Sequence, residues 1–150
     1  MPEGSLVYAA KFVCGYMPEP SQATDEGPVE PGSYATAINV HNPNAIPVNF
    51  IKKAVLLFDA GSKAAERFEE PKPPGRRIGA ELGPDWGMEI DCRDIRLEML
   101  KGQVSPAPIF IKGWVVIESA QPLDVVAVYT VRAPNGTVSI ATDRVTPTQL

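Results

Sequence analysis

The sequence contains one histidine, His41, and nucleophilic catalysis would have to be built around it. A histidine activates a hydroxyl by accepting its proton, and Ser33 and Ser139 are the candidate nucleophiles. No G-x-S-x-G motif, which would present a serine on a tight strand-to-helix turn, occurs in the chain. His41 lies instead beside the turn-forming HNPN segment, where a polar residue closing a strand is the simpler interpretation. We therefore predict that the protein is not an enzyme.

Metal and cofactor motifs are also missing. One histidine and two separated cysteines cannot complete a four-ligand zinc site without carboxylates, and the CxxC and HxxxH spacings are absent. Neither GxGxxG nor GxxxxGK[ST] occurs. Glu89, Asp91 and Asp94 form an acidic cluster that could bind calcium or act as a general acid, but it lacks the Asp-x-Asp-x-Asp-Gly pattern. Acidic residues that cap a helix explain the cluster better, so we predict no cofactor and no metal.

The best polar recognition cluster is formed by His41, Asn42 and Asn44, which lie together beside a predicted turn. We name these three as candidate ligand-binding residues, although turn chemistry alone also explains them. The basic segment Lys72–Arg77 could meet an acidic partner or be solvated. Trp86 could stack on a sugar ring.

Cys14 and Cys92 each end a predicted strand. A disulfide between them would stabilise the fold by roughly 4 to 5 kcal/mol in the chain-entropy model. In the cytosol they would instead be two reduced, buried thiols, and the sequence leaves this choice open. The first residues carry no basic flank followed by an apolar segment, so they do not resemble a signal peptide. A cytoplasmic location is slightly favoured over an extracellular one.

Length and composition predict one domain over residues 1–150. The net charge of −4 and a pI near 5.0 argue against binding to nucleic acid or anionic membranes. No apolar stretch reaches about 18 residues, so no membrane insertion is expected. The 16 prolines and 12 glycines divide the chain into short segments and disfavour long helices. Many short strands joined by such loops are typical of a sandwich or barrel.

We predict an all-β fold, an antiparallel β-sandwich of about seven to eight strands with one short helix over Arg93–Lys101. Asp91 is the expected N-cap of that helix and Gly102 its stop. Pro-rich loops are expected over residues 15–32 and 70–86. The predicted strands are Leu6–Cys14, Tyr34–His41, Val48–Phe58, Gly87–Cys92, Ile111–Glu118, Leu123–Val131 and Thr137–Thr142, with candidate edge strands at Arg67–Glu70 and Arg77–Leu82.

Turn-forming segments predict how these strands connect. Residues 42–46 would close a hairpin between Tyr34–His41 and Val48–Phe58. Residues 119–122 would join the next hairpin, and Asn135-Gly136 would form a type I′ turn. Residues 109–142 would then form a three-stranded meander, with Val138 and Ile140 facing inward.

The strand Leu123–Val131 is apolar on both faces. Val126 and Val128 point away from the face expected to line the core. A strand with two apolar faces lies between packed layers or forms a subunit interface. Val126, Val128 and Trp114 are therefore candidate interface residues, and a homo-oligomer is expected.

Several short motifs resemble the sensory rhodopsin transducer family. These are CGYMP at Cys14–Pro18, the strand–turn–strand segment Tyr34–Asp59, the segment Pro74–Ile95 that runs from PGRRIG to EIDCRDI, and the strand pair Phe110–Val131. The chain also looks like uncharacterised bacterial proteins that share KFVCG, SYATAINVHNPN and VVIES-x-x-x-LDVVAVYT. The resemblance implies a small β-sandwich that self-associates and has an interaction role. The two cysteines, the helix after Cys92 and the C-terminal strand depart from the family's pattern.

The sequence therefore predicts a non-enzymatic, homo-oligomeric interaction module that binds a protein or a small ligand, as a transducer does. The alternative is a secreted structural or filament-forming protein. A carbohydrate-binding domain or a hydrolase at His41 is a third and less favoured hypothesis.

Overall fold

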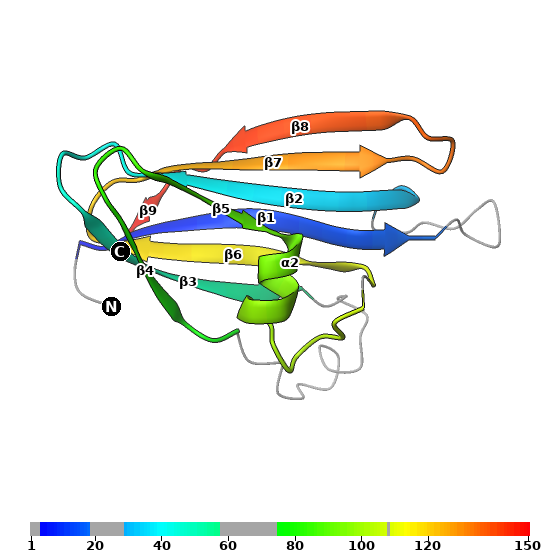
Figure 1. Ribbon diagram of the computed structural model, residues 1–150, viewed down its shortest axis with the longest axis horizontal. Helices are drawn as coiled ribbons and strands as arrows, with labels where there is room; N and C mark the ends of the chain where they lie inside the picture. Colours follow the sequence, from blue (N-terminus) through cyan, green and yellow to red (C-terminus); the bar gives the residue numbers. More distant parts are fainter. Residues whose placement is uncertain (1–3, 19–28, 58–74, 108) are drawn as a thin grey trace.

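Two antiparallel sheets hold the nine strands of the computed structural model, which describes residues 4–18, 29–57, 75–107 and 109–150 (Figure 1). Sheet A contains, in spatial order, β4 (Ile78–Leu82), β3 (Val48–Leu56), β6 (Ile111–Ser119), β1 (Leu6–Met17) and β9 (Thr148–Gln149). Sheet B contains β5 (Gly87–Asp91), β2 (Gly32–His41), β7 (Asp124–Arg132) and β8 (Val138–Arg144). The prediction of an all-β fold with a single short helix is confirmed for the described residues.

The two sheets are continuous through β1. Most of β1 pairs with β6, but Gly15–Met17 pair with the start of β2. The alternation of β1 follows the prediction, since every second side chain is buried: Tyr8, Ala10, Phe12 and Cys14. The neighbouring strand β6 contributes Val115 and Ile117 to the same core, and sheet B contributes Ile38, Val40 and Val125.

The short helix has two parts, α2 (Cys92–Asp94) and the wider turn η1 (Ile95–Met99). Asp91 caps it as predicted: its carboxylate accepts from the N–H of Asp94 at 2.9 Å, and the Asp94 carboxylate accepts from the N–H of Asp91 at 3.1 Å. This reciprocal capping satisfies main-chain donors that the helix itself leaves free. The helix ends two residues before the predicted Lys101, and Ile95 and Met99 enter the core.

Two of the predicted hairpins are wrong. β2 does not pair with β3, and β6 does not pair with β7; in both cases the chain crosses from one sheet to the other. The segments 42–47 and 120–123 are therefore inter-sheet connections. Turn-forming residues determine where a strand ends, but a hairpin and an inter-sheet crossing both need such residues.

The β7–β8 hairpin forms, with a different turn from the predicted type I′. Only Gly136 has a positive φ, 87°, and the N–H of Ala133 donates to the carbonyl of Thr137. This geometry is a three-residue loop that ends in a left-handed glycine. Val138 and Ile140, predicted to face inward, are 56% and 71% exposed, because they pair with Arg132 and Thr130 on the outer face of sheet B.

β1 continues to Met17 inside the loop predicted over residues 15–32. β4 confirms the candidate edge strand predicted at Arg77–Leu82, inside the second predicted loop. The edge strand predicted at Arg67–Glu70 and the end of the strand predicted at Val48–Phe58 lie outside the described residues. The C-terminal β9 pairs with Leu6 and Val7 on the edge of β1 opposite β6.

Gly113 in β6 marks the tightest approach within sheet A. A Cβ atom there would lie 1.9 Å from the carbonyl oxygen of Val55 and 2.9 Å from the ring of Phe12. We expect Gly113→Ala to lower the free energy of unfolding by about 3 kcal/mol, because neither backbone nor ring can move away freely. Urea denaturation measures this loss. Gly79→Ala in β4 is the matched control, since its Cβ would meet nothing within 4 Å; equal losses in both variants would contradict the prediction.

Candidate functional site

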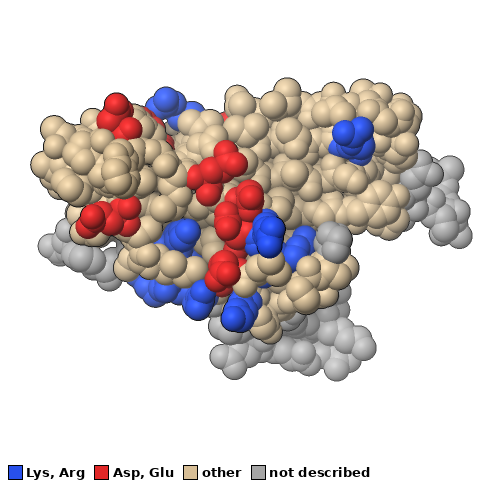
Figure 2. Space-filling model, viewed as in Figure 1, with Lys and Arg blue, Asp and Glu red and all other residues tan. Residues whose placement is uncertain are grey.

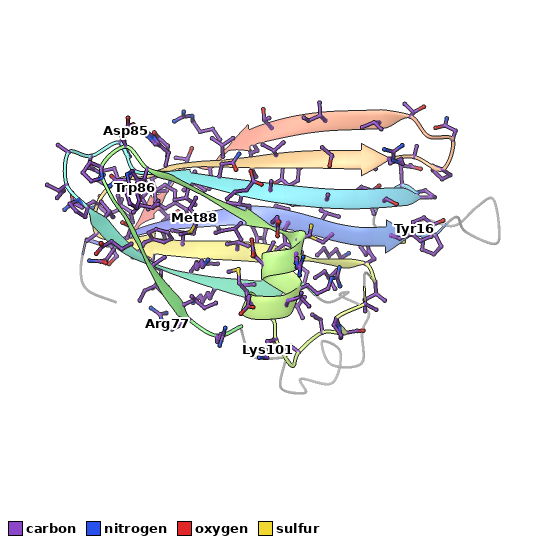
Figure 3. All side chains as sticks on the ribbon, in the orientation of Figure 1. Tyr16, Arg77, Asp85, Trp86, Met88 and Lys101 are labelled. Carbon is purple, nitrogen blue, oxygen red and sulfur yellow. A yellow bond between two sulfur atoms is a disulfide. The ribbon has the colours of Figure 1, made fainter. Side chains whose placement is uncertain are left out.

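His41 is held between two carboxylates at one end of the sandwich. Its Nδ1 lies 3.0 Å from Oδ2 of Asp124, the first residue of β7, and its Nε2 lies 2.8 Å from Oδ1 of Asp85. Asp85 belongs to the β4–β5 turn, which forms two main-chain hydrogen bonds with Asn42. The N–H of Asp85 donates to the carbonyl of Asn42, and the N–H of Asn42 donates to the carbonyl of Trp86. Figure 3 shows Asp85 and Trp86 at this end of the molecule. Arg144 of β8 approaches the other oxygen of Asp124 at 3.4 Å.

These contacts favour the protonated form of His41. A neutral imidazole has one N–H, whereas an imidazolium donates from both nitrogens and can bond both carboxylates. The hydrogen bond to Asp124, followed by that to Asp85, raises the pKa of His41 above its ordinary value. His41 therefore bridges β2, β7 and the β4–β5 turn through its two ring nitrogens.

The candidate nucleophiles do not reach His41. Ser33 lies eight residues earlier in β2, about 27 Å away along an extended strand. Ser139 pairs with Val131 near the far end of β7. The structure thus brings carboxylates to His41 but no hydroxyl from either predicted serine.

Asn42 and Asn44 have structural partners. Asn42 is fully buried, and its amide donates to the carbonyls of Ile46, Leu82 and Gly83. Its Oδ1 accepts from the main-chain N–H and the side-chain amide of Asn44. Asn42 therefore holds the connection between β2 and β3, and ligand binding at the cluster would have to use His41 or exposed atoms of Asn44.

Cys14 and Cys92 are joined by a disulfide, with their Cα atoms 5.8 Å apart. This bond ties the end of β1 to the first residue of the helix across 78 positions of sequence. The Sγ atom of Cys92 also accepts from the N–H of Thr36 at 3.2 Å. Of the two alternatives that the sequence left open, the structure contains the bonded pair.

The candidate interface residues lie on different sheets. Val126 and Val128 are half-buried on the outer face of sheet B, so they are not buried within one subunit. Trp114 lies on the outer face of sheet A, 37% exposed, with the Lys11 ammonium 5.3 Å from its ring centroid. One flat surface of a partner cannot cover all three side chains.

A groove of about 760 Å³ over β3, β4 and β6 was not predicted from the sequence. Glu118 lies in it, and its side chain is only 11% exposed because Arg77 and Lys53 approach its two oxygens at 2.7 and 3.6 Å. The hydrogen bond from Arg77 lowers the pKa of Glu118. Ile51 and Gly79 also line the groove. Arg77 stands 41 positions from Glu118, so no local motif revealed the pair.

Buried charge also occurs at Arg96 on η1, which donates to the carbonyl of Ile109 at 2.9 Å. Burial lowers the pKa of this guanidinium. The acidic residues Asp91 and Asp94 are used in the helix cap, and no group of three metal-ligating side chains occurs within the described ranges. None of the helices described there is long and apolar enough to span a bilayer.

Comparisons with known proteins identify a fold class only. No protein-family model matches the chain, and no curated protein matches it. A crystal structure of a Thermotoga maritima protein, numbered 1070, is similar, with a TM-score of 0.52 over 95% of this chain and 94% of that one. The two sequences are 11% identical, so the likeness supports the β-rich fold and carries no function.

The pKa of His41 provides a test of the bridge. Its contribution to stability is present in full below about pH 6.5, the usual histidine pKa, and is lost as the pH rises through the raised pKa of the folded state. We expect Asp124→Asn to lower the pKa of His41 more than Asp85→Asn does. Because the chain has one histidine, its ring resonances can be followed by NMR without ambiguity.

Asp143→Asn is the control for this titration, since Asp143 makes no contribution to the raised pKa of His41. A pKa of His41 that is the same in wild type and in Asp124→Asn would show that the carboxylates do not stabilise the imidazolium.

Proposed function

We propose that this protein is a non-enzymatic β-sandwich interaction module that forms a homo-oligomer and binds another protein or a small ligand. The resemblance of its motifs to sensory rhodopsin transducers supports an interaction role of this kind. The observation that carries the proposal is the apolar surface of β7 and β8. Four apolar side chains of their outer face are in contact with solvent: Val126, Val128, Val138 and Ile140.

The charged residues of this surface, Asp124, Arg132 and Arg144, lie at its ends. Figure 2 shows acidic and basic groups gathered around the helix and the lower strands, whereas the area over β7 and β8 is largely uncharged. Exposed apolar patches of this kind commonly mark sites of protein association. The groove around Glu118, whose lining is mostly apolar, offers a second surface where a protein segment or a small ligand could bind.

The disulfide favours a second candidate function, a secreted structural or filament-forming protein. Disulfides persist in oxidising compartments and are rare in the cytosol. Self-association through an exposed surface is also what a filament requires, although a filament needs a second, non-identical contact.

Light scattering tests the proposed self-association. We expect the wild-type protein at micromolar concentration to have a mass that is a multiple of the monomer mass. The double variant Val138→Lys/Ile140→Lys should shift it to the monomer, because it would place two added charges on the apolar outer face of β8. Ala9→Lys, at an exposed position on the outer face of sheet A, is the control and should leave the mass unchanged. A monomeric wild-type protein would remove the oligomer from the proposal.

Thiol titration tests the compartment argument. Protein isolated without reductant and then unfolded should contain no free thiol, and reduction should release two per chain. Replacing both cysteines by alanine should lower the free energy of unfolding by roughly 4 to 5 kcal/mol in the chain-entropy model. Two free thiols in the unreduced protein from its native host would contradict the secreted alternative and leave the interaction module intact.

A further inference from the structure

The strand β8 has one edge without a strand partner among the described residues. It pairs with β7 on one side only, and all seven of its residues are exposed. The β7–β8 hairpin therefore extends the sheet into solvent, with Ile140 71% exposed in its centre.

The free edge of β8 offers regularly spaced main-chain groups. At one end of the β7–β8 ladder the N–H of Ala133 donates to the carbonyl of Thr137. At the other end the N–H of Val145 donates to the carbonyl of Val125. Bonded pairs recur at every second residue of an antiparallel ladder, so the odd-numbered residues of β8 direct their groups toward β7. The even-numbered residues direct theirs toward the free edge: Val138, Ile140, Thr142 and Arg144.

This edge lacks the features that usually prevent strand addition. Natural edge strands are commonly protected by proline, lysine, a bulge or a covering segment. β8 contains no proline and no lysine, and its register with β7 is unbroken from Val138 to Arg144. Its two charged residues, Asp143 and Arg144, stand together at its end, and Arg144 is turned toward Asp124. By contrast, the edge of β1 that does not pair with β6 is covered by β9 and by side chains of sheet B.

We propose that β8 pairs with β8 of a second copy of this chain, antiparallel and about a two-fold axis at Ala141, so that sheet B continues from one protomer into the other. This inference rests on the proposed function and specifies how two copies meet. The dimer would be closed, because each copy contributes the same strand edge, and once the two β8 edges are paired neither can bind a third copy.

The position of the axis follows from the sequence of β8. With the axis at Ala141, Ile140 bonds the partner's Thr142 and Val138 bonds the partner's Arg144, so all four outward residues of each strand are paired. Ser139 stands opposite the partner's Asp143, which its hydroxyl can bond, and no like charges face each other. Ala141 meets its own copy at a non-bonded position, where Cα atoms are about 4.5 Å apart and a small side chain fits.

The neighbouring registers are poorer. An axis one residue later would place Val138 opposite the partner's Thr146, which lies beyond the last residue of β8 and directly before Pro147. An axis one residue earlier would place Arg144 opposite the partner's Gly136, which belongs to the hairpin loop and is not in an extended conformation. Among these three registers, only the axis at Ala141 pairs all four outward residues within the strand.

Disulfide trapping tests this geometry. In Ala141→Cys the two new thiols would meet across the axis within the Cα separation that disulfides require, about 4.4–6.8 Å. In Ser139→Cys, the matched control on the same face of β8, the two cysteines would be separated by four residues of strand, about 14 Å. We expect mild oxidation to cross-link Ala141→Cys at least tenfold faster than Ser139→Cys, as followed on non-reducing gels. The native disulfide does not interfere, since Cys14 is fully buried.

The possible outcomes separate this inference from the proposed function. A dimeric protein in which both variants cross-link at equal rates would overturn edge pairing and leave self-association standing. A monomeric wild-type protein would overturn both. Selective cross-linking of Ala141→Cys supports both.

Proline substitution provides an independent test without cysteines. Thr142→Pro removes an N–H that points to the free edge, so the protomer should keep its melting temperature while dimerisation weakens at least tenfold. Ala141→Pro removes an N–H directed toward β7 and should instead lower the melting temperature. A Thr142→Pro protein that remains as dimeric as wild type would overturn the inference.

Discussion

The fold depends on how the main-chain groups on the edge of β1 that faces sheet B are hydrogen-bonded. Between Tyr8 and Cys14 one edge of this strand pairs with β6, while the other faces sheet B and has no strand partner in the described part of the chain. The hydroxyl of buried Thr36 accepts from the N–H of Val13 and donates to its carbonyl, both at 2.9 Å, and so replaces a missing strand partner. The hydroxyl of Tyr129 donates to the carbonyl of Lys11 at 2.9 Å.

These bonds determine how the two sheets sit on each other. A buried main-chain group without a partner costs about 1–3 kcal/mol, so any sliding of sheet B along β1 would be opposed at several points. Tyr8 adds a contact in the opposite direction, since its hydroxyl accepts from the N–H of Leu123 after the crossing between β6 and β7. The disulfide fixes one end of this arrangement, and the bridge at His41 fixes the other.

The sequence predicted the local structure of strands, caps and turns better than it predicted which strands pair with each other. The core face of β1, the cap at Asp91 and the position, though not the type, of the turn at Gly136 were predictable because alternation, capping and positive φ leave local patterns. The hairpins predicted at residues 42–46 and 119–122 were wrong because turn-forming residues do not specify which sheet the next strand joins. Val138 and Ile140 were placed inward because alternation shows that two faces differ and does not show which face another layer covers.

Only part of the candidate site was predicted, because sequence patterns do not show which distant residues come together. His41 was recognised because it is the only histidine, but its partners Asp85 and Asp124 lie 44 and 83 positions away. Asn42 was assigned to ligand binding from its polarity, whereas its burial makes it part of the scaffold. Glu118 was not recognised, because an acidic residue on an outer strand face is ordinarily solvated, and its cover comes from Arg77 on a separate strand.

The inter-sheet crossings after β2 and β6 have a consequence for the order of folding. Because β2 and β6 are each followed by a strand of the opposite sheet, most strand pairs of this protein join residues far apart in the chain. Closing such distant pairs is slow, while a hairpin with a short loop forms within microseconds. The β7–β8 hairpin is therefore available early, before the sheets that will support it. In a concentrated refolding mixture its edge would be exposed longest, and dilution during refolding should favour the correctly folded chain over aggregates.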